Sequence, residues 1–322
     1  MRSQGPPQEI LTSYFPALTG LIWSPVEGGL SGAEVWRGDD STGTPVFALK
    51  RLPAEVEPAR LNAIHKWMTQ AAHLAFVPSI LRTTSGDTSV YSRGRGWEIT
   101  RWMPGKPVTD PAIADVETAC TAVAQLHGAW PIVHKSTCPG VINRLRAIQD
   151  FRLQFGTNQS PQIPLSMTLI PLVRRAWSAV VANLEQTDNL LRPWENLSVK
   201  LRPCVRDLRA EHVLFSAHQV VGIIDYGAMA VDHPAVDLAR LLGDFGCLDE
   251  PRYSAAIRAY QRESSFDAPI EFIRTLAHSG TVCSVIGWLL RLVTQQQTLP
   301  AEDMILKRMT VLLGRLNQFA PE

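Results

Sequence analysis

The first hundred residues alternate between short β-favouring runs and turns rich in glycine and aspartate. One run from Val26 to Trp36 and a second, the apolar Val-Phe-Ala-Leu at 46–49, flank the turn at 38–43, and this arrangement predicts a hairpin. A further hairpin is predicted from Ile80 to Arg101. Between the two, apolar side chains recur every three or four residues from Pro58 to Phe76, which predicts a helix.

Beyond Pro104-Gly105-Lys106-Pro107 the apolar pattern becomes helical. A helix is predicted from Pro111 to Trp130, with Asp110 as its candidate N-cap. Further helices are expected over Val141–Phe155, Ile170–Leu184 and from Pro234 to the end, around a β-rich insert over Val199–Tyr226. The expected fold class is α+β, with a small β-rich domain at 1–103 and a larger helical domain at 104–322.

Composition narrows the class of protein. Of the 322 residues 45% are apolar and 19% charged, and 31 basic against 30 acidic residues leave a net charge of +1. This balance disfavours binding to nucleic acid or to an anionic membrane surface by bulk charge. The five cysteines form no CxxC pair and are expected to be buried, reduced thiols. The N-terminus has no apolar signal core, and the apolar stretch Ser279–Val293 is shorter than the roughly 20 residues of a membrane span. A cytoplasmic protein is therefore expected, and its oligomeric state is left open.

A glycine-rich segment precedes a lysine at a strand end. Gly28-Gly29-Leu30-Ser31-Gly32 is followed about twenty residues later by Lys50. Glycines allow a backbone to approach an anion closely, and a lysine on the next strand reaches the same phosphates. Considered alone, glycines in a hairpin are more often ordinary turn residues than a phosphate-binding loop.

Two aspartates stand where chain direction changes. Asp207 lies in a loop, with His212 five residues later and a Val-Leu-Phe run after it. A loop carboxylate accepts the proton of a substrate hydroxyl in phosphoryl transfer, and the downstream polar group holds a metal. Asp225 follows the apolar run 220–224 and precedes Tyr226-Gly227, a place where a metal would neutralise its charge. The alternatives are a surface carboxylate for Asp207 and a hydrogen-bonded turn aspartate for Asp225.

Taken in order, these features resemble the aminoglycoside phosphotransferase and choline-kinase-like branch of the protein-kinase-like superfamily. The resemblance extends from Val26 to Phe245 and includes Ala48-Leu49-Lys50, the hinge-like run from Glu98 to Gly105 and the helix end at Gln125-Leu126-His127. It is densest from Asp207 to Leu242, where Ile224-Asp225-Tyr226-Gly227 leads into Asp232-His233-Pro234-Ala235-Val236-Asp237.

The resemblance implies a two-lobed kinase-like fold with ATP and magnesium, or manganese, as cofactors. The loop containing Gly28, Gly29, Ser31 and Gly32 would cover the phosphates that Lys50 holds, and Thr100 and Trp102 would flank the adenine. Asp207 would be the catalytic base, His212 and Asp225 the metal ligands, and Asp237 a structural carboxylate that braces the catalytic loop.

The chain departs from the family pattern in the catalytic loop. Val205, Arg206 and Arg209 replace a histidine, a glycine and a second histidine, and His212 replaces an asparagine. An imidazole suits manganese or zinc better than magnesium. The helix expected over 58–76 has no acid to pair with Lys50, so His65, Asn62 or a carboxylate from elsewhere is the candidate partner.

The C-terminal helices of aminoglycoside-binding relatives supply carboxylates to a polycation. From Leu241 to Glu322 this chain has nine acids and eight bases, so it has no acidic surplus. The sequence therefore favours an ATP-dependent phosphotransferase acting on the hydroxyl of a small molecule. The alternative is a pseudokinase that binds nucleotide or acts as a scaffold. A protein kinase is disfavoured because no activation segment ending in Ala-Pro-Glu follows Gly227.

Overall fold

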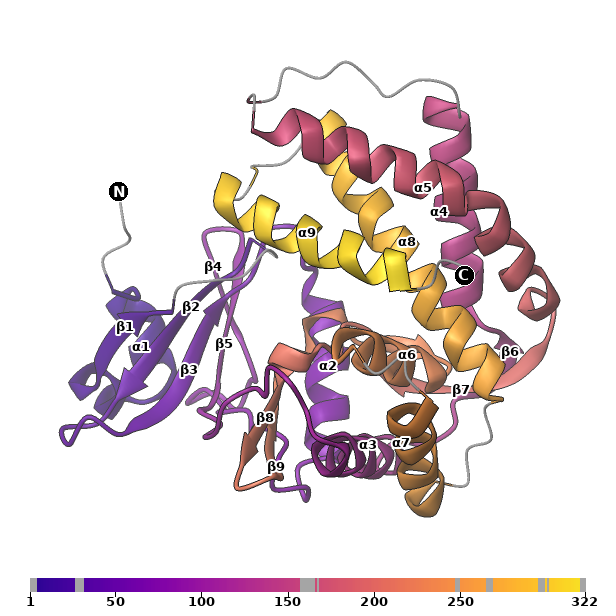
Figure 1. Cartoon of the computed structure of the whole chain (residues 1–322). Helices are drawn as coiled ribbons and strands as arrows, with labels where there is room; N and C mark the ends of the chain where they lie inside the picture. Colours follow the sequence, from indigo (N-terminus) through magenta and orange to yellow (C-terminus); the bar gives the residue numbers. More distant parts are fainter. Residues whose placement is uncertain are drawn as a thin grey trace. The chain divides into compact units, whose positions relative to one another are not determined.

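The computed structural model of the chain describes residues 5–26, 32–156, 166, 168–246, 250–264, 269–294, 299 and 301–318. The chain divides into two compact units: residues 1–108 with 211–228, and residues 109–210 with 229–322. The small unit is rich in antiparallel sheet, and the larger one is helical (Figure 1). The mixed α+β class expected from the sequence is confirmed.

The first unit is built on a five-stranded antiparallel sheet in the order β1-β2-β3-β5-β4. Its elements are α1 (Gln8–Tyr14), η1 (Pro16–Gly20), β1 (Ile22–Pro25), β2 (Glu34–Asp39), β3 (Pro45–Arg51), α2 (Pro58–Gln70), β4 (Val90–Ser92) and β5 (Arg95–Arg101). Helix α1 packs on the sheet, where Tyr14 donates its hydroxyl to the Trp97 carbonyl at 3.0 Å and Trp97 stacks on Trp36. This core fixes the register of the strands that carry the polar residues described below.

Residues 211–228 return to this unit from far along the chain. They form the end of η3 (Ala210–His212), then β8 (Val213–Ser216), β9 (Gln219–Ile223) and η4 (Tyr226–Ala228). Backbone hydrogen bonds attach the hairpin: Phe215 and Lys106 exchange N–H···O contacts of 2.8 and 3.0 Å, and Ile223 donates to the Phe76 carbonyl at 2.8 Å. The compact units thus differ from lobes divided between residues 103 and 104, because this later hairpin packs with the N-terminal strands.

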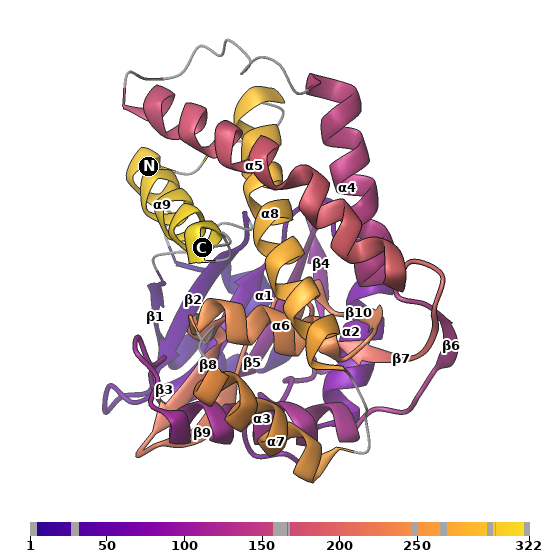
Figure 2. The same ribbon diagram turned by 45° about the vertical axis from the view of Figure 1, so that its right-hand side comes forward.

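The second unit consists mainly of helices. They are α3 (Ile113–Gly128), α4 (Pro139–Phe155), α5 (Leu169–Leu191), α6 (Ala235–Asp244), α7 (Glu250–Glu263), α8 (Ile270–Thr294) and α9 (Glu302–Gln318), with η2 (Arg192–Trp194) and the strands β6 (His134–Thr137), β7 (Ser198–Cys204) and β10 (Ala230–Asp232). Strand β7 lies between β10 and β6. Helix α8 packs against α4, α5, α6 and α9, and α3 packs against α7 (Figure 2).

Several expected boundaries were wrong. Helix α2 ends at Gln70 rather than Phe76, because the Ala71 N–H tightens onto the Met68 carbonyl and a chain of turns follows. Asp110 does not cap α3: the cap position is Ala112, whose N–H is accepted by the Asp115 carboxylate at 3.0 Å. The strand expected over Val26–Trp36 overlaps β2 only from Glu34, and β2 continues to Asp39; residues 27–31 lie outside the described part.

Helix α8 is longer than the apolar stretch expected at Ser279–Val293. Residues Ile270–Val293 are long and apolar enough to cross a membrane by length and composition, and 61% of the most apolar window is buried within the protein. Such burial is also typical of a core helix. Cys120, Cys138 and Cys204 are buried and, like the half-buried Cys283, are free thiols, while Cys247 lies outside the described residues.

Candidate active site

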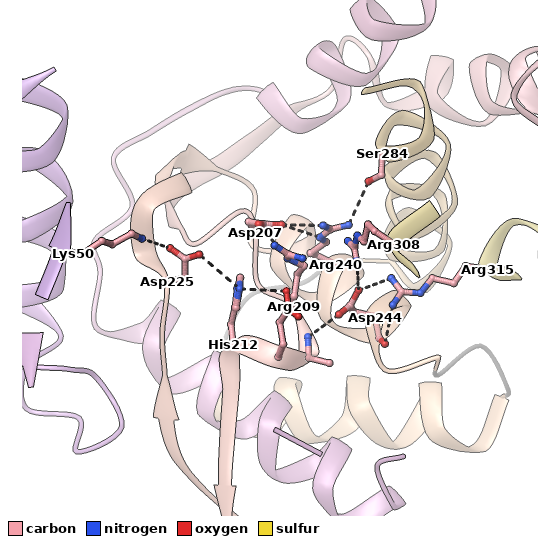
Figure 3. Close-up of polar contacts among 12 residues, drawn as sticks. Lys50, Asp207, Arg209, His212, Asp225, Arg240, Asp244, Ser284, Arg308 and Arg315 are labelled. Carbon is pink, nitrogen blue, oxygen red and sulfur yellow. Dashed lines mark hydrogen bonds and ion pairs between the residues drawn. The ribbon is translucent and has the colours of Figure 1, made fainter. Parts of the chain in front are cut away.

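The first unit brings Lys50 and Asp225 together from positions 175 residues apart. Lys50 Nζ lies 2.7 Å from Asp225 Oδ1 (Figure 3). Lys50 is near the end of β3, and Asp225 follows β9 with φ at +63°, a left-handed conformation that is uncommon for a residue with a side chain. The Ile224 N–H donates to the His212 carbonyl at 2.9 Å, which anchors the backbone just before this strained residue.

A second carboxylate faces Lys50 across the sheet. Lys50 and Glu98 are direct partners in the antiparallel β3–β5 ladder, so their side chains project from the same face. Burial alone would lower the pKa of Lys50, but the carboxylates of Asp225 and Glu98 outweigh it and hold that pKa above its ordinary value. Lys50 therefore stays a charged ammonium in a half-buried place.

Helix α2 supplies a histidine behind Glu98. His65 is 1% exposed, its Nε2 lies 2.7 Å from Glu98 Oε2, and its Nδ1 lies 2.8 Å from the Thr88 hydroxyl. Of the partners that the sequence left open for Lys50, the structure places a carboxylate from a neighbouring strand opposite the lysine and uses His65 to hold it. Asn62 is exposed.

His212 and Asp225 face each other at the end of the β8–β9 hairpin. His212 is 6% exposed, and its Nε2 lies 3.7 Å from Asp225 Oδ2. Two ligands about 2.1 Å from one octahedral ion are separated by about 3–4 Å, so this spacing fits one metal ion. The nitrogen and oxygen donors fit manganese or zinc more closely than magnesium.

The other residues expected at the nucleotide lie around the same strands. Gly28, Gly29 and Ser31 fall outside the described residues, whereas Gly32 precedes β2, is exposed and has φ at +74°. Thr100 is on β5 opposite Ala48. Trp102 follows β5, donates its N–H to the Val46 carbonyl at 2.9 Å and lies beneath the Arg37 guanidinium.

Asp207 belongs to the second unit, in the loop that follows β7. Its Oδ1 accepts hydrogen bonds from Arg240 Nε at 3.2 Å and Nη2 at 2.9 Å, and its Oδ2 lies 3.3 Å from Arg209 Nε. The carboxylate is 36% exposed. Two guanidinium groups thus fix its orientation while it remains accessible from outside.

One face of α6 holds the loop containing Asp207. Asp237, Arg240 and Asp244 follow each other at i, i+3 and i+7, a spacing that places them on one side of a helix. Asp237 accepts the N–H groups of Val205 at 2.7 Å and Arg206 at 2.6 Å, and Asp244 accepts that of Ala210 at 3.0 Å. The bracing role that the family resemblance implied for Asp237 is confirmed by these contacts.

The family glycine position explains a strained residue in this loop. Arg206, which stands where the glycine is expected, has φ at +67°. That conformation costs a non-glycine residue about 1 kcal/mol or more. Its side chain lies 3.3 Å from the fully buried carboxylate of Asp232, an ion pair that helps to offset the strain.

A buried group of three potential metal donors lies beside this loop. Among the residues that the structure describes, His127, Cys204 and Asp237 place their donor atoms within 4.8 Å of one another. His127 is already hydrogen-bonded to Tyr260 at 2.8 Å and to Asp237 at 3.0 Å, and Asp237 holds two backbone N–H groups. This group therefore serves the bracing of the loop.

Sequence reasoning missed the residues that contact the expected ones. Glu98 lies in the hinge-like run, and the register of the two strands around Lys50 is the signal that places it opposite the lysine. Arg240 was signalled by its spacing of three residues from Asp237. Arg308 and Arg315 are seven residues apart on α9, a spacing that places them on one face of the helix. Their spacing does not indicate that their partner is Asp244.

The sequence pattern of the family described as "Phosphotransferase enzyme family" matches residues 22–272. No curated protein matches the chain.

Solved structures of this kind share the fold. An aminoglycoside phosphotransferase from Alicyclobacillus acidocaldarius subsp. acidocaldarius DSM 446 has a TM-score of 0.61 at 17% identity, covering 99% of this chain and 96% of its own. A spectinomycin phosphotransferase solved with ADP and spectinomycin gives 0.66 at 11%, covering 93% and 89%. A choline/ethanolamine kinase family protein from Mesorhizobium loti gives 0.55 at 14%, covering 92% of each. These likenesses confirm the kinase-like fold expected from the sequence.

Proposed function

This chain belongs to the phosphotransferase enzyme family, and from that premise we propose that it transfers the γ-phosphoryl group of ATP to a hydroxyl of a small molecule. The acceptor oxygen forms a bond to the γ-phosphorus as the bond to the β,γ-bridging oxygen breaks. ADP leaves, and the hydroxyl proton passes to an oxygen of Asp207. A cytoplasmic location, where ATP is available, stays a prediction.

The observation that carries the proposal is the 2.7 Å contact between Lys50 and Asp225. A lysine on a strand of the sheet and an aspartate after a later hairpin are the two charges that a kinase-like site needs for nucleotide phosphates and their metal. When nucleotide binds, the phosphates would take the place of Asp225 beside the ammonium. Glu98 would keep Lys50 aligned during that exchange.

Asp225 and His212 would hold the divalent metal. The ion would neutralise charge on the transferring phosphate. Because His212 contributes a nitrogen donor, this protein is expected to prefer manganese over magnesium more strongly than a relative with asparagine at that position. The ADP in the similar spectinomycin phosphotransferase supports a nucleotide as the donor.

The second candidate function is a pseudokinase that binds nucleotide without turnover. Two observations favour it: His212 stands at an expected metal-ligand position, and Asp207 has both oxygens engaged by arginines. Turnover separates the two functions, because a pseudokinase binds ATP and transfers nothing.

Isothermal titration calorimetry with ATP tests the proposal. Wild type is expected to bind ATP only with a divalent metal, and Asp225→Ala to lose at least tenfold in affinity. His212→Asn is expected to shift the preference from manganese to magnesium and to preserve or raise magnesium-dependent activity. Asp303→Ala, which removes an exposed carboxylate on α9, is the control. Metal-independent binding, or wild-type affinity in Asp225→Ala, would contradict this assignment.

A further inference from the structure

Arginines crowd around two aspartates in the second unit. Arg240 and Arg209 contact Asp207, whereas Arg315 is hydrogen-bonded to the carboxylate of Asp244 and Arg308 lies 3.8 Å from the same carboxylate (Figure 3). We call these four arginines with the two aspartates the arginine cluster. Its members come from helices α6 and α9 and from the loop after β7. Residues far apart in the sequence therefore meet there, such as Arg315 and Asp244, which are 71 positions apart.

The charges of the arginine cluster do not balance. Four guanidinium groups minus two carboxylates leave an excess of +2. Four neighbouring charges, Arg144, Arg206, Asp232 and Asp237, cancel one another and leave this count at +2. The exposed carboxylate of Glu211, two residues after Arg209, lowers it to +1 when it is included. Within the described part of the chain, positive charge therefore remains in excess around these arginines.

The excess charge is partly withdrawn from water. The side chains of Arg209, Arg308 and Arg315 are each 14% exposed and that of Arg240 is 20% exposed. Holding unbalanced cations at such burial is costly unless an anion binds there. Asp207, at 36%, is the most exposed member, so the cluster opens to solvent beside the expected base.

Arg308 shows the crowding most clearly. Burial and then the neighbouring guanidinium of Arg240 lower the pKa of Arg308 to about 10, despite the opposite pull of Asp244. The pKa of Asp244 is held below its ordinary value although burial raises it, because Arg315 and Arg240 outweigh the burial. Asp244 is thus shared among several cations and does not satisfy Arg308 alone.

Resting on the proposed function, we propose that the arginine cluster binds a phosphate or carboxylate group of the acceptor, so that the substrate is a hydroxylated anion. Guanidinium groups bind such groups in a bidentate manner through charge-assisted hydrogen bonds. An anion at Arg308 and Arg240 offsets the excess charge and holds its hydroxyl on the side where Asp207 is accessible. A polycationic amino sugar would add to the excess and is disfavoured.

A matched set of sugars tests this inference. Glucose, glucosamine, glucuronate and glucose 6-phosphate differ mainly in the charge they carry, and calorimetry without nucleotide measures their affinity at 50 and 250 mM salt. Glucuronate or glucose 6-phosphate is expected to bind at least tenfold more tightly than glucose, and less tightly at high salt. Arg308→Gln is expected to remove most of this difference, while Lys307→Gln, on the exposed side of the same helix, leaves it unchanged. Equal or tighter binding of glucose or glucosamine, or no binding of either anion at millimolar concentration, would overturn the inference.

Thermal unfolding separates a binding role of Arg308 from a structural one. Because an unbalanced cation is removed, ligand-free Arg308→Gln is expected to unfold at the same temperature as wild type or higher. A lower unfolding temperature with unchanged anion affinity would overturn the inference. Anion binding without any phosphoryl transfer would refute the proposed function and support the inference. Phosphoryl transfer to glucosamine that Arg308→Gln leaves unchanged would support the proposed function and refute the inference.

Discussion

Asp225 and Asp207, the two aspartates assigned to metal and base, have opposite electrostatic surroundings. Around Asp225 the ammonium of Lys50 meets two carboxylates, those of Asp225 and Glu98, and these three groups sum to −1. Around Asp207 and Asp244, four guanidiniums and the two carboxylates themselves sum to +2. The first region is suited to gain a cation and the second to gain an anion, and a phosphotransferase needs both a metal and an oriented acceptor. Ion pairs of similar geometry in one chain therefore favour ligands of opposite charge, depending on the net charge that surrounds them.

The largest expected effect separates binding from chemistry. Asp207→Asn removes the proton acceptor but leaves the region around Lys50 and Asp225 intact, so kcat is expected to fall by roughly 10³-fold, within the range typical of a lost general base. ATP affinity is expected to stay within twofold of wild type. Steady-state kinetics and calorimetry on the same preparation measure the two quantities, and loss of both would show that the two regions do not act separately.

Acid is expected to weaken the second region through His233, which precedes α6. Burial, then His127 and Arg202, lower the pKa of His233 to about 3. The unfolded chain binds this proton near pH 6.5 and the folded protein only near pH 3, so the free energy of unfolding falls as pH drops through that window, by on the order of 3–5 kcal/mol. His233→Asn keeps an acceptor for the Ala235 N–H and is expected to reduce the loss, as denaturant unfolding at pH 7 and pH 4 measures. Exposed His73→Asn is the control, and an unchanged pH dependence in His233→Asn would contradict the assignment.

A smaller effect is expected in the first region from Glu98→Gln. The substitution keeps the shape but removes one of the two carboxylates beside Lys50, so ATP affinity is expected to fall by about tenfold, or about 1.4 kcal/mol. Glu34→Gln, on the neighbouring strand β2 where Glu34 pairs with Arg51, is the matched control. If Glu98→Gln bound ATP like wild type, Asp225 alone would position Lys50.

Much of the fold was predictable from local patterns. The order of elements follows from apolar spacing, and the family motifs place Lys50, Asp207 and Asp225 at strand ends and loops. Boundaries were less predictable, because hydrogen bonds of single residues set them: α3 begins after Ala112, whose N–H is accepted by Asp115, and not after Asp110. Helix α5 continues to Leu191 beyond the expected Leu184 because Thr187, read as polar, is fully buried on the same face.

The contacts of the candidate site were less predictable than its members. Lys50 is near Glu98 through strand register and near Asp225 through the return of a hairpin 175 residues later. Arg315 meets Asp244 across 71 residues. Periodicity marks which face of a helix each residue occupies, but the partner depends on how helices pack, and that information is distributed over the whole core.

The way α6 holds the loop after β7 has a consequence for how this protein evolves. Asp237 and Asp244 grip backbone N–H groups at Val205, Arg206 and Ala210, and every amino acid except proline provides such a group. The path of the loop is thus encoded outside the loop itself. Val205 and Leu208 are buried, but the side chains at the partly exposed positions of the loop can diverge while its backbone keeps Asp207 in place. A lineage can therefore explore new acceptors there without rebuilding the scaffold.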